Sequence, residues 1–171
     1  MSQHGRSAAR PSRAGETLGL LGWLVLTGAA AAAGAVASVD ARSFYGQLAQ
    51  PDWAPPPWLF APVWTVLYVL MSIAAWLVWR VRGWRGAPAA LGVYAAQLAA
   101  NALWTWLFFG WHRGAWAFGE ILVLWLLIVA TIALFWRVRR IAAVLLLPYA
   151  TWVTFASALT YAIWALNPQA L

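Results

Sequence analysis

The segment WLFAPVWTVLYVLMSIAAWLVW, residues 58–79, runs for 22 residues without a charged side chain and ends directly before Arg80. A helix needs about 20 mainly apolar residues to cross the hydrocarbon core of a bilayer. Arg80, Arg82 and Arg85 follow at once, and their long side chains can reach the lipid headgroups. The segment therefore predicts a membrane-spanning helix, and the chain an integral membrane protein.

One further segment of the same kind precedes this one in the sequence, and three follow it. Only 9% of the 171 residues are charged, against about 25% in an average soluble protein. A secretory signal peptide is an alternative for the first segment, but nothing of soluble composition follows it. We expect an all-α integral membrane protein, a five-transmembrane-helix bundle with spans at 18–39, 58–79, 88–110, 114–136 and 141–166.

Two segments outside the spans are long enough to describe. Residues 1–16 are polar, and we expect a disordered basic cytoplasmic tail before a transmembrane domain at 17–167. Residues 40–57, DARSFYGQLAQPDWAPPP, contain four prolines. These prolines argue against a regular helix and predict an extended, ordered cover on the bundle. Pro148 lies inside the fifth span, where we expect a kink.

The arginines predict the orientation in the membrane. Nine of the eleven fall in the tail, the second loop and the fourth loop. The positive-inside rule then places the N-terminus in the cytoplasm, and the proline-rich loop and the C-terminus outside. We expect a multi-pass protein of a bacterial cell membrane.

The net charge of +7 does not indicate nucleic-acid binding, because the arginines gather at the ends of spans.

Several kinds of site are excluded by residue type. Cysteine is absent, and the two histidines, His4 and His112, lie outside the spans. A disulfide framework, a thiolate metal site and a buried histidine ligand are therefore not expected. We predict no metal site and no obligatory cofactor. No nucleophile–base pair, carboxylate dyad or glycine-rich phosphate loop occurs within the spans, so a conventional catalytic site is not expected either.

Polar and aromatic residues share one face of the third span. Gln97, Asn101 and Trp104 follow at i, i+4 and i+7. Amides at this depth are costly without partners, so either they form hydrogen bonds between helices or they line a ligand cavity. The same two interpretations, plain core and ligand site, apply to helically spaced residues of the second and fifth spans: Trp64, Tyr68, Tyr149, Trp152, Ala156 and Leu159.

Two more features of the spans have competing interpretations. Gly92, Ala96 and Ala100 form a row of small residues about 100° around the third helix from Gln97. Such rows suit close helix packing, and we expect a homodimer through this face. Glu120 is the one charge inside the fourth span. It is either an interfacial acid near a helix N-terminus or a buried acid in an ion or proton path.

Three motifs resemble one known family. FYGQLAQPDWAPPPWLFAPVWTVLY at 44–68, AAQLAANALWTWLFF at 95–109 and PYATWVTFASALTYAIWALN at 148–167 occur in its order and spacing. It is the tryptophan-rich sensory protein family, also called the translocator protein or peripheral benzodiazepine receptor family. The resemblance extends over about residues 20–167 and fits a chain with 15 tryptophans.

The resemblance implies a five-helix bundle, usually homodimeric, in which the first loop covers a pocket for porphyrins, other tetrapyrroles and drug-like aromatic compounds. Trp64 and Asn101 would make the polar contacts to the ligand. Trp64 and Trp152 would be the candidates for light-driven porphyrin breakdown. The implied ligand-binding residues are Tyr45, Trp53, Pro55, Trp64, Tyr68, Gln97, Asn101, Trp104, Trp152 and Ala156.

The chain departs from the family pattern at two places. Thr160 stands where the family often has asparagine. The cholesterol motif needs a lysine or arginine within five residues after its tyrosine. None follows Tyr161, so this motif is incomplete. The function that the resemblance implies is a membrane tetrapyrrole-binding sensor or regulator. A transporter of porphyrins or related small molecules and a light-dependent porphyrin-degrading enzyme are the alternatives. Protoporphyrin and haem would both bind as ligands, without a protein group on the metal.

Overall fold

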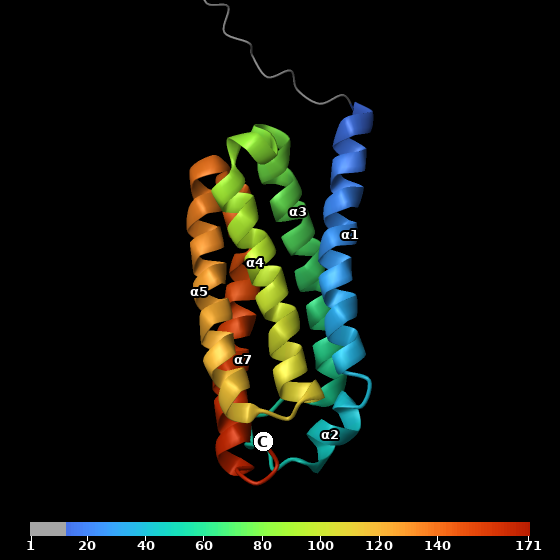
Figure 1. The fold of residues 1–171 in the computed structure, drawn as a ribbon, viewed down its shortest axis with the longest axis vertical. Helices are drawn as coiled ribbons and strands as arrows, with labels where there is room; N and C mark the ends of the chain where they lie inside the picture. The colour runs from blue at the N-terminus through green and yellow to red at the C-terminus, as the bar shows by residue number, and fades with distance from the viewer. Residues whose placement is uncertain (1–12) are drawn as a thin grey trace, which may run out of the picture.

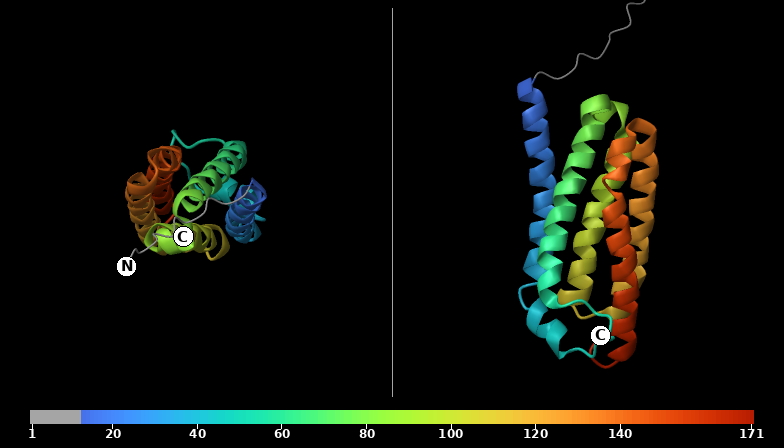
Figure 2. Two further views of the ribbon diagram at one scale, coloured as in Figure 1. Left: turned by 90° about the horizontal axis from the view of Figure 1, so that it is seen from above. Right: turned by 180° about the vertical axis from the view of Figure 1, so that it is seen from behind.

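In the computed structural model, which describes residues 13–171, five long helices stand side by side (Figure 1 and Figure 2). They are α1 (Arg13–Ala37), α3 (Phe60–Gly86), α4 (Pro88–Thr105), α5 (Gly114–Val138) and α7 (Leu147–Leu166). Four short elements connect them: α2 (Ala41–Gln47), the 3₁₀ turn η1 (Pro57–Leu59), the π-helical turn η2 (Trp106–Gly110) and α6 (Arg140–Val144). The described residues contain no strand, which confirms the all-helical class.

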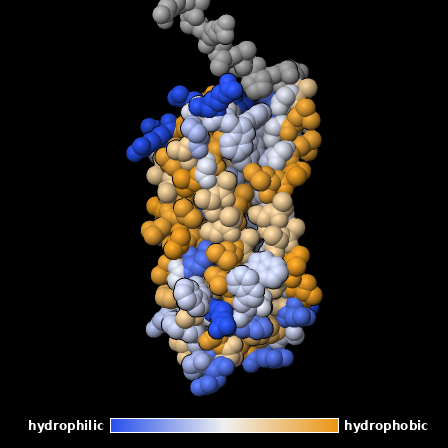
Figure 3. Space-filling model, in the orientation of Figure 1, coloured by the Kyte–Doolittle hydropathy of each residue, from blue (hydrophilic) through white to orange (hydrophobic). Residues whose placement is uncertain are grey.

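The composition of these helices is that of a multi-pass membrane protein. Within residues 13–171, four helical stretches are long and apolar enough to cross a membrane: Ala14–Ala37, Pro57–Gly86, Gly114–Val138 and Arg140–Leu166. Hydrophobic residues cover most of the middle of the face in Figure 3, and hydrophilic residues gather at its two ends. The helix α4 is not among the four, because its polar residues Gln97 and Asn101 lower its hydropathy. A fifth span through α4 stays a prediction.

The first helix begins earlier than expected. Residues 1–12 of the predicted tail lie outside the described residues, but 13–16 form the first turn of α1. Contacts with α3 hold this turn, since the Glu16 carboxylate pairs with Arg80 at 3.0 Å and the Glu16 carbonyl accepts a hydrogen bond from the Trp76 indole at 2.9 Å. Further along α1, Thr27 and Tyr94 share a buried hydrogen bond of 2.7 Å. The helix is therefore part of the bundle.

The prediction of no regular helix in residues 40–57 is wrong for the first half of that loop. The helix α2, Ala41–Gln47, lies across one end of the bundle (Figure 1). Its residues precede the first proline, Pro51, so every backbone N–H in this stretch is free to form a helical hydrogen bond. The prolines affect only the second half, which is extended before η1 begins at Pro57.

Proline and glycine fix the ends of the other helices. Pro148 lies in the first turn of α7. The fifth predicted span is interrupted there rather than kinked, because α6 ends at Val144 and α7 begins at Leu147. Val144 carries the carbonyl that a continuous helix would press against the Pro148 ring. Pro88 opens α4 in the same first-turn position. Gly83, with φ +62°, interrupts the regular geometry of α3, a conformation in which glycine has no steric penalty.

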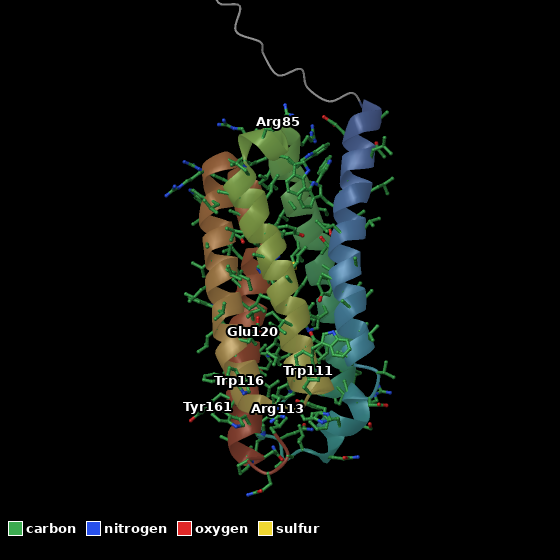
Figure 4. The ribbon with its side chains drawn as sticks, in the orientation of Figure 1. Arg85, Trp111, Arg113, Trp116, Glu120 and Tyr161 are labelled. Atoms are coloured by element: carbon green, nitrogen blue, oxygen red, sulfur yellow. The ribbon has the colours of Figure 1, made fainter. Side chains whose placement is uncertain are left out.

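The two ends of the bundle differ in charge. The start of α1 and the α3–α4 and α5–α6 connections lie at one end, which we call the arginine-rich end; α2, η2 and the C-terminus lie at the other, the α2 end (Figure 1). Figure 4 shows Arg85 at the first and Arg113 at the second. The helix ends and the connection at the arginine-rich end carry Arg80, Arg82, Arg85, Arg137, Arg139 and Arg140. Which end faces the cytoplasm stays a prediction.

Candidate functional site

A cavity of about 390 Å³ lies at the α2 end, between α1, α2, α3 and the junction of α4 with η2. Small residues of α1 form one wall, and aromatic residues of α3 and α4 form the opposite wall. The helix α2 covers its outer side. The fifteen lining residues are Ala31, Gly34, Ala35, Ser38, Ala41, Arg42, Tyr45, Pro57, Phe60, Ala61, Trp64, Tyr68, Trp104, Thr105 and Phe109.

The aromatic wall is built by residues one helical turn apart. Trp64 and Tyr68 are i, i+4 neighbours on α3, with ring centroids 5.5 Å apart. Trp104 of α4 stacks on Phe108 at 5.7 Å and meets the edge of Phe109 at 6.0 Å. These rings hold one another in place, so the cavity presents fixed aromatic surfaces to any ligand.

Side chains of the cover hold its two halves together and attach it to the bundle. Tyr45 of α2 is buried, and burial raises the pKa of its phenol. The Tyr45 hydroxyl donates to the Pro55 carbonyl at 3.5 Å. The Gln50 amide donates to the Tyr45 carbonyl at 2.6 Å, and Phe44 stacks on His112 at 4.0 Å. These contacts join the two halves of the cover and attach it to the α4–α5 connection.

Asn167 ties this cover to the end of α7. Its side-chain oxygen accepts a hydrogen bond from the Ala49 N–H at 2.8 Å, and its amide donates to the Ala49 carbonyl at 2.9 Å. The same amide donates to the Ile163 carbonyl at 2.7 Å. The backbone N–H and C=O of Ala49, in the loop that follows α2, are thus both hydrogen-bonded to Asn167, as they would be to a neighbouring β-strand.

The polar stripe of α4 lies behind the cavity and makes hydrogen bonds between helices. The Tyr68 hydroxyl donates to Asn101 Oδ1 at 2.7 Å, and the Tyr149 hydroxyl donates to Gln97 Oε1 at 2.9 Å. Both amides are buried. This confirms the interhelical interpretation for their oxygens. Their Nδ2 and Nε2 atoms are buried without a partner among the described residues, as is Trp104 Nε1, so hydrogen-bond donors remain free in this region.

The Tyr149–Gln97 pair makes a prediction about stability. Replacing Tyr149 with Phe leaves the whole Gln97 amide buried without a partner, and we expect a loss of about 1 kcal/mol in the free energy of unfolding. Gln97→Leu introduced into the Tyr149→Phe protein should cost nothing further, because the orphaned amide is then gone. Unfolding in mixed detergent micelles measures all four members of the cycle. Additive effects of the two substitutions would contradict the pairing.

The structure separates the residues that the resemblance placed in one pocket. Tyr45, Trp64, Tyr68 and Trp104 line the cavity. Trp152 instead lines a separate open groove between α3 and α7, beside Pro148 and Phe155. The Phe60 ring lies between the two spaces, because it lines the cavity and meets the Trp152 ring edge-on at 5.9 Å.

The remaining expected site residues do not line the cavity. Trp53 is 51% exposed and contacts Phe155 at 5.8 Å. Pro55 contributes its carbonyl to Tyr45. Ala156 is buried in α7, and Gln97 and Asn101 are the amides described above.

Sequence reasoning missed several lining residues. Ala31, Gly34 and Ala35 of α1 line the cavity, and no role in a site was expected for them. Arg42 lines the cavity from α2, in a stretch that was interpreted as loop. Helical spacing could have indicated both the α1 residues and Arg42 as neighbours on one face. The α1 residues follow at i, i+3 and i+4, and Arg42 and Tyr45 at i and i+3.

Glu120 lies near the lower part of α5 in Figure 4, in the second turn of the helix. One of its carboxylate oxygens is buried without a partner among the described residues. The favourable field of a helix N-terminus falls off within the first turn. This position therefore gives little support to the interfacial interpretation, and a role in an ion or proton path stays untested.

Taken together, the helices and the cavity define a multi-pass helical membrane protein with an aromatic, covered cavity at one end. The TspO/MBR family model matches residues 22–165. The chain is 43% identical over 150 residues to protein CrtK of Rhodobacter capsulatus, covering 85% of this chain and 91% of that protein.

Two other relatives carry more descriptive names. The tryptophan-rich sensory protein of Cereibacter sphaeroides is 43% identical over 147 residues, covering 86% of this chain and 90% of the relative. The translocator protein of Ovis aries is 42% identical over 127 residues, covering 72% and 75%. The chain belongs to the TspO/MBR family, and the resemblance of its three motifs is confirmed.

Proposed function

We propose that this protein is a membrane sensor or regulator that binds a tetrapyrrole, such as protoporphyrin, in the cavity beneath α2. The observation that carries the proposal is the covered cavity with a wall of Trp64, Tyr68 and Trp104. Its volume of about 390 Å³ lies within the range of small-molecule sites. A flat aromatic ligand would stack on such a wall, where each aromatic contact contributes about 1 kcal/mol beyond the burial of area.

In this proposal Asn101 positions the aromatic wall. Its Oδ1 holds the Tyr68 hydroxyl at 2.7 Å, and Tyr68 lines the cavity. The Trp64 indole N–H makes no hydrogen bond to any described residue and would serve a carbonyl or carboxylate of the ligand. The two polar contacts expected from the resemblance thus become one direct contact, Trp64, and one indirect contact, Asn101.

The ligand is proposed to bind without a protein group on its metal. The lining residues include no histidine, cysteine or methionine. Within the described residues, no group of three His, Cys, Asp or Glu side chains could hold a metal ion. Haem and metal-free protoporphyrin would then depend on the same aromatic contacts.

A transporter is the second candidate, favoured by the printed name of the Ovis aries relative, translocator protein. Three assays on the purified protein distinguish the possibilities. Saturable protoporphyrin binding alone supports the sensor. Accumulation of protoporphyrin inside proteoliposomes supports the transporter, and a light-dependent covalent change in bound protoporphyrin supports the degrading enzyme. If no saturable binding is found, the proposal is wrong.

We also propose a homodimer through Gly92, Ala96 and Ala100 of α4. Gly92 and Ala96 are exposed, and a Cβ added at Gly92 would meet no atom within 4 Å. Packing within the chain therefore does not require a small residue at Gly92, whereas close approach of a second helix would.

Ala96→Leu should shift the protein from dimer towards monomer in detergent, because the larger side chain separates the two backbones. Light scattering of the protein–detergent complex measures the mass, and protoporphyrin binding should be unchanged. Ala133→Leu, at an exposed position of α5, is the matched control. An unchanged dimer in the Ala96→Leu protein would place the interface elsewhere.

A further inference from the structure

Arg42 is the only charged residue among the fifteen that line the cavity. It lies in the first turn of α2 and is exposed. No carboxylate of the described residues forms an ion pair with its guanidinium, since the ion pair that they do form joins Arg80 to Glu16. A guanidinium offers five N–H donors in a planar fork that matches a carboxylate or a phosphate.

The hydroxyl groups of the lining are already engaged, whereas the indole N–H groups of Trp64 and Trp104 are donors without a partner among the described residues. The Ser38 hydroxyl donates to the Gly34 carbonyl at 3.0 Å, and the Thr105 hydroxyl donates to the Asn101 carbonyl at 3.1 Å. The two tyrosine hydroxyls donate to Pro55 and Asn101, as described above. The cavity therefore combines an apolar, aromatic interior with one uncommitted cation on its covering helix.

The position of this cation is defined by the fold. Arg42 and Tyr45 are i, i+3 neighbours on the same side of α2, and Tyr45 is anchored by burial. Trp64 and Tyr68 lie on the α3 wall of the same cavity. Because α2 lies outside the spans, the guanidinium stays accessible to water and carries little desolvation cost until a ligand arrives.

We propose that Arg42 selects ligands that carry an acidic group, so that the site accepts amphipathic aromatic acids rather than neutral aromatic compounds. The apolar ring system would lie against the aromatic wall, and a carboxylate at its edge would pair with the Arg42 guanidinium. This inference rests on the proposed function, since it specifies the ligand class of the same cavity. The same anionic chemistry could come from a lipid headgroup of net negative charge, and the test therefore uses a lipid with no net charge.

The test compares protoporphyrin, which carries two carboxylates, with its dimethyl ester, which has the same ring and no charge. Both are titrated into the full-length protein in nanodiscs of phosphatidylcholine, and tryptophan quenching reports binding. The wild-type protein should bind the acid about five- to tenfold more tightly than the ester, as one charge-assisted pair would give. Arg42→Gln should lower acid binding to the level of the ester and leave ester binding unchanged.

Two variants sharpen the test. Arg42→Lys should keep part of the preference, because it keeps the charge but not the fork. Arg113→Gln, which removes an arginine at the same end but outside the lining, should keep all of it. Equal binding of acid and ester by the wild-type protein, or an unchanged preference in Arg42→Gln, would overturn the role of Arg42 while the proposed function stands. Binding of neither porphyrin would overturn both.

Discussion

Replacing Trp64 with alanine should weaken protoporphyrin binding by about tenfold or more, since loss of about 1.4 kcal/mol changes an affinity tenfold. Trp64 lines the cavity, and its ring lies 5.5 Å from that of Tyr68 and 6.1 Å from that of Tyr149. Removing the indole takes away the stacking surface and the free N–H together. Trp64→Phe should show an intermediate loss, because it keeps an aromatic ring, although a smaller one, and removes the N–H.

The matched control is Trp136→Ala. Trp136 is 49% exposed at the end of α5, beneath Arg140 at the arginine-rich end, and does not line the cavity. Its removal should leave the affinity unchanged in the same fluorescence titration. Trp152→Ala should have a smaller effect than Trp64→Ala, because Trp152 reaches the cavity only through Phe60. Equal effects of the Trp64 and Trp136 substitutions would mean that the ligand binds elsewhere.

Replacing Asn167 with leucine should release the loop that follows α2. The substitution removes the two hydrogen bonds to Ala49, and each is worth about 1 kcal/mol. The Ala49 amide should then exchange with solvent about 30-fold faster, since that is the factor for about 2 kcal/mol. Hydrogen–deuterium exchange measured on peptides that cover residues 48–56 reports this change.

Asn167→Asp provides the control for this second prediction. The carboxylate can still accept the hydrogen bond from the Ala49 N–H, but it cannot donate to the Ala49 carbonyl. We therefore expect an exchange rate between those of the wild-type and Asn167→Leu proteins. If exchange at Ala49 is the same in all three proteins, Asn167 does not hold the cover in place.

The bundle was predictable from the sequence because its signals are local. Runs of uncharged residues, such as 58–79 before Arg80, indicate four of the helical stretches, but their bounds differ by up to seven residues, since α3 continues to Gly86. The end of one run could not be read in this way. Arg13–Glu16 is polar, and the contacts of Glu16 with Arg80 and Trp76, more than 50 residues away, hold this turn against the bundle.

The cavity was predictable only in part, because helical periodicity shows which residues share a face but not what that face meets. Tyr68 and Asn101 were placed on the right faces, and the structure joins them. Trp152 has the same kind of spacing, yet its face turns to a different space. The role of Arg42 was not predicted, because the prolines nearby suggested an extended loop in place of α2. The contact of Asn167 with Ala49 spans 118 residues, so no local pattern indicates it.

The most direct test of the proposed site compares haem with metal-free protoporphyrin. Each is titrated into the purified protein, and tryptophan quenching and the absorbance spectrum are recorded together. Because no histidine, cysteine or methionine lines the cavity, the two ligands should bind with similar affinity, and the haem spectrum should show no axial ligand from the protein. Binding of haem alone, with the spectrum of a protein-ligated iron, would contradict an aromatic site that holds the ring without its metal.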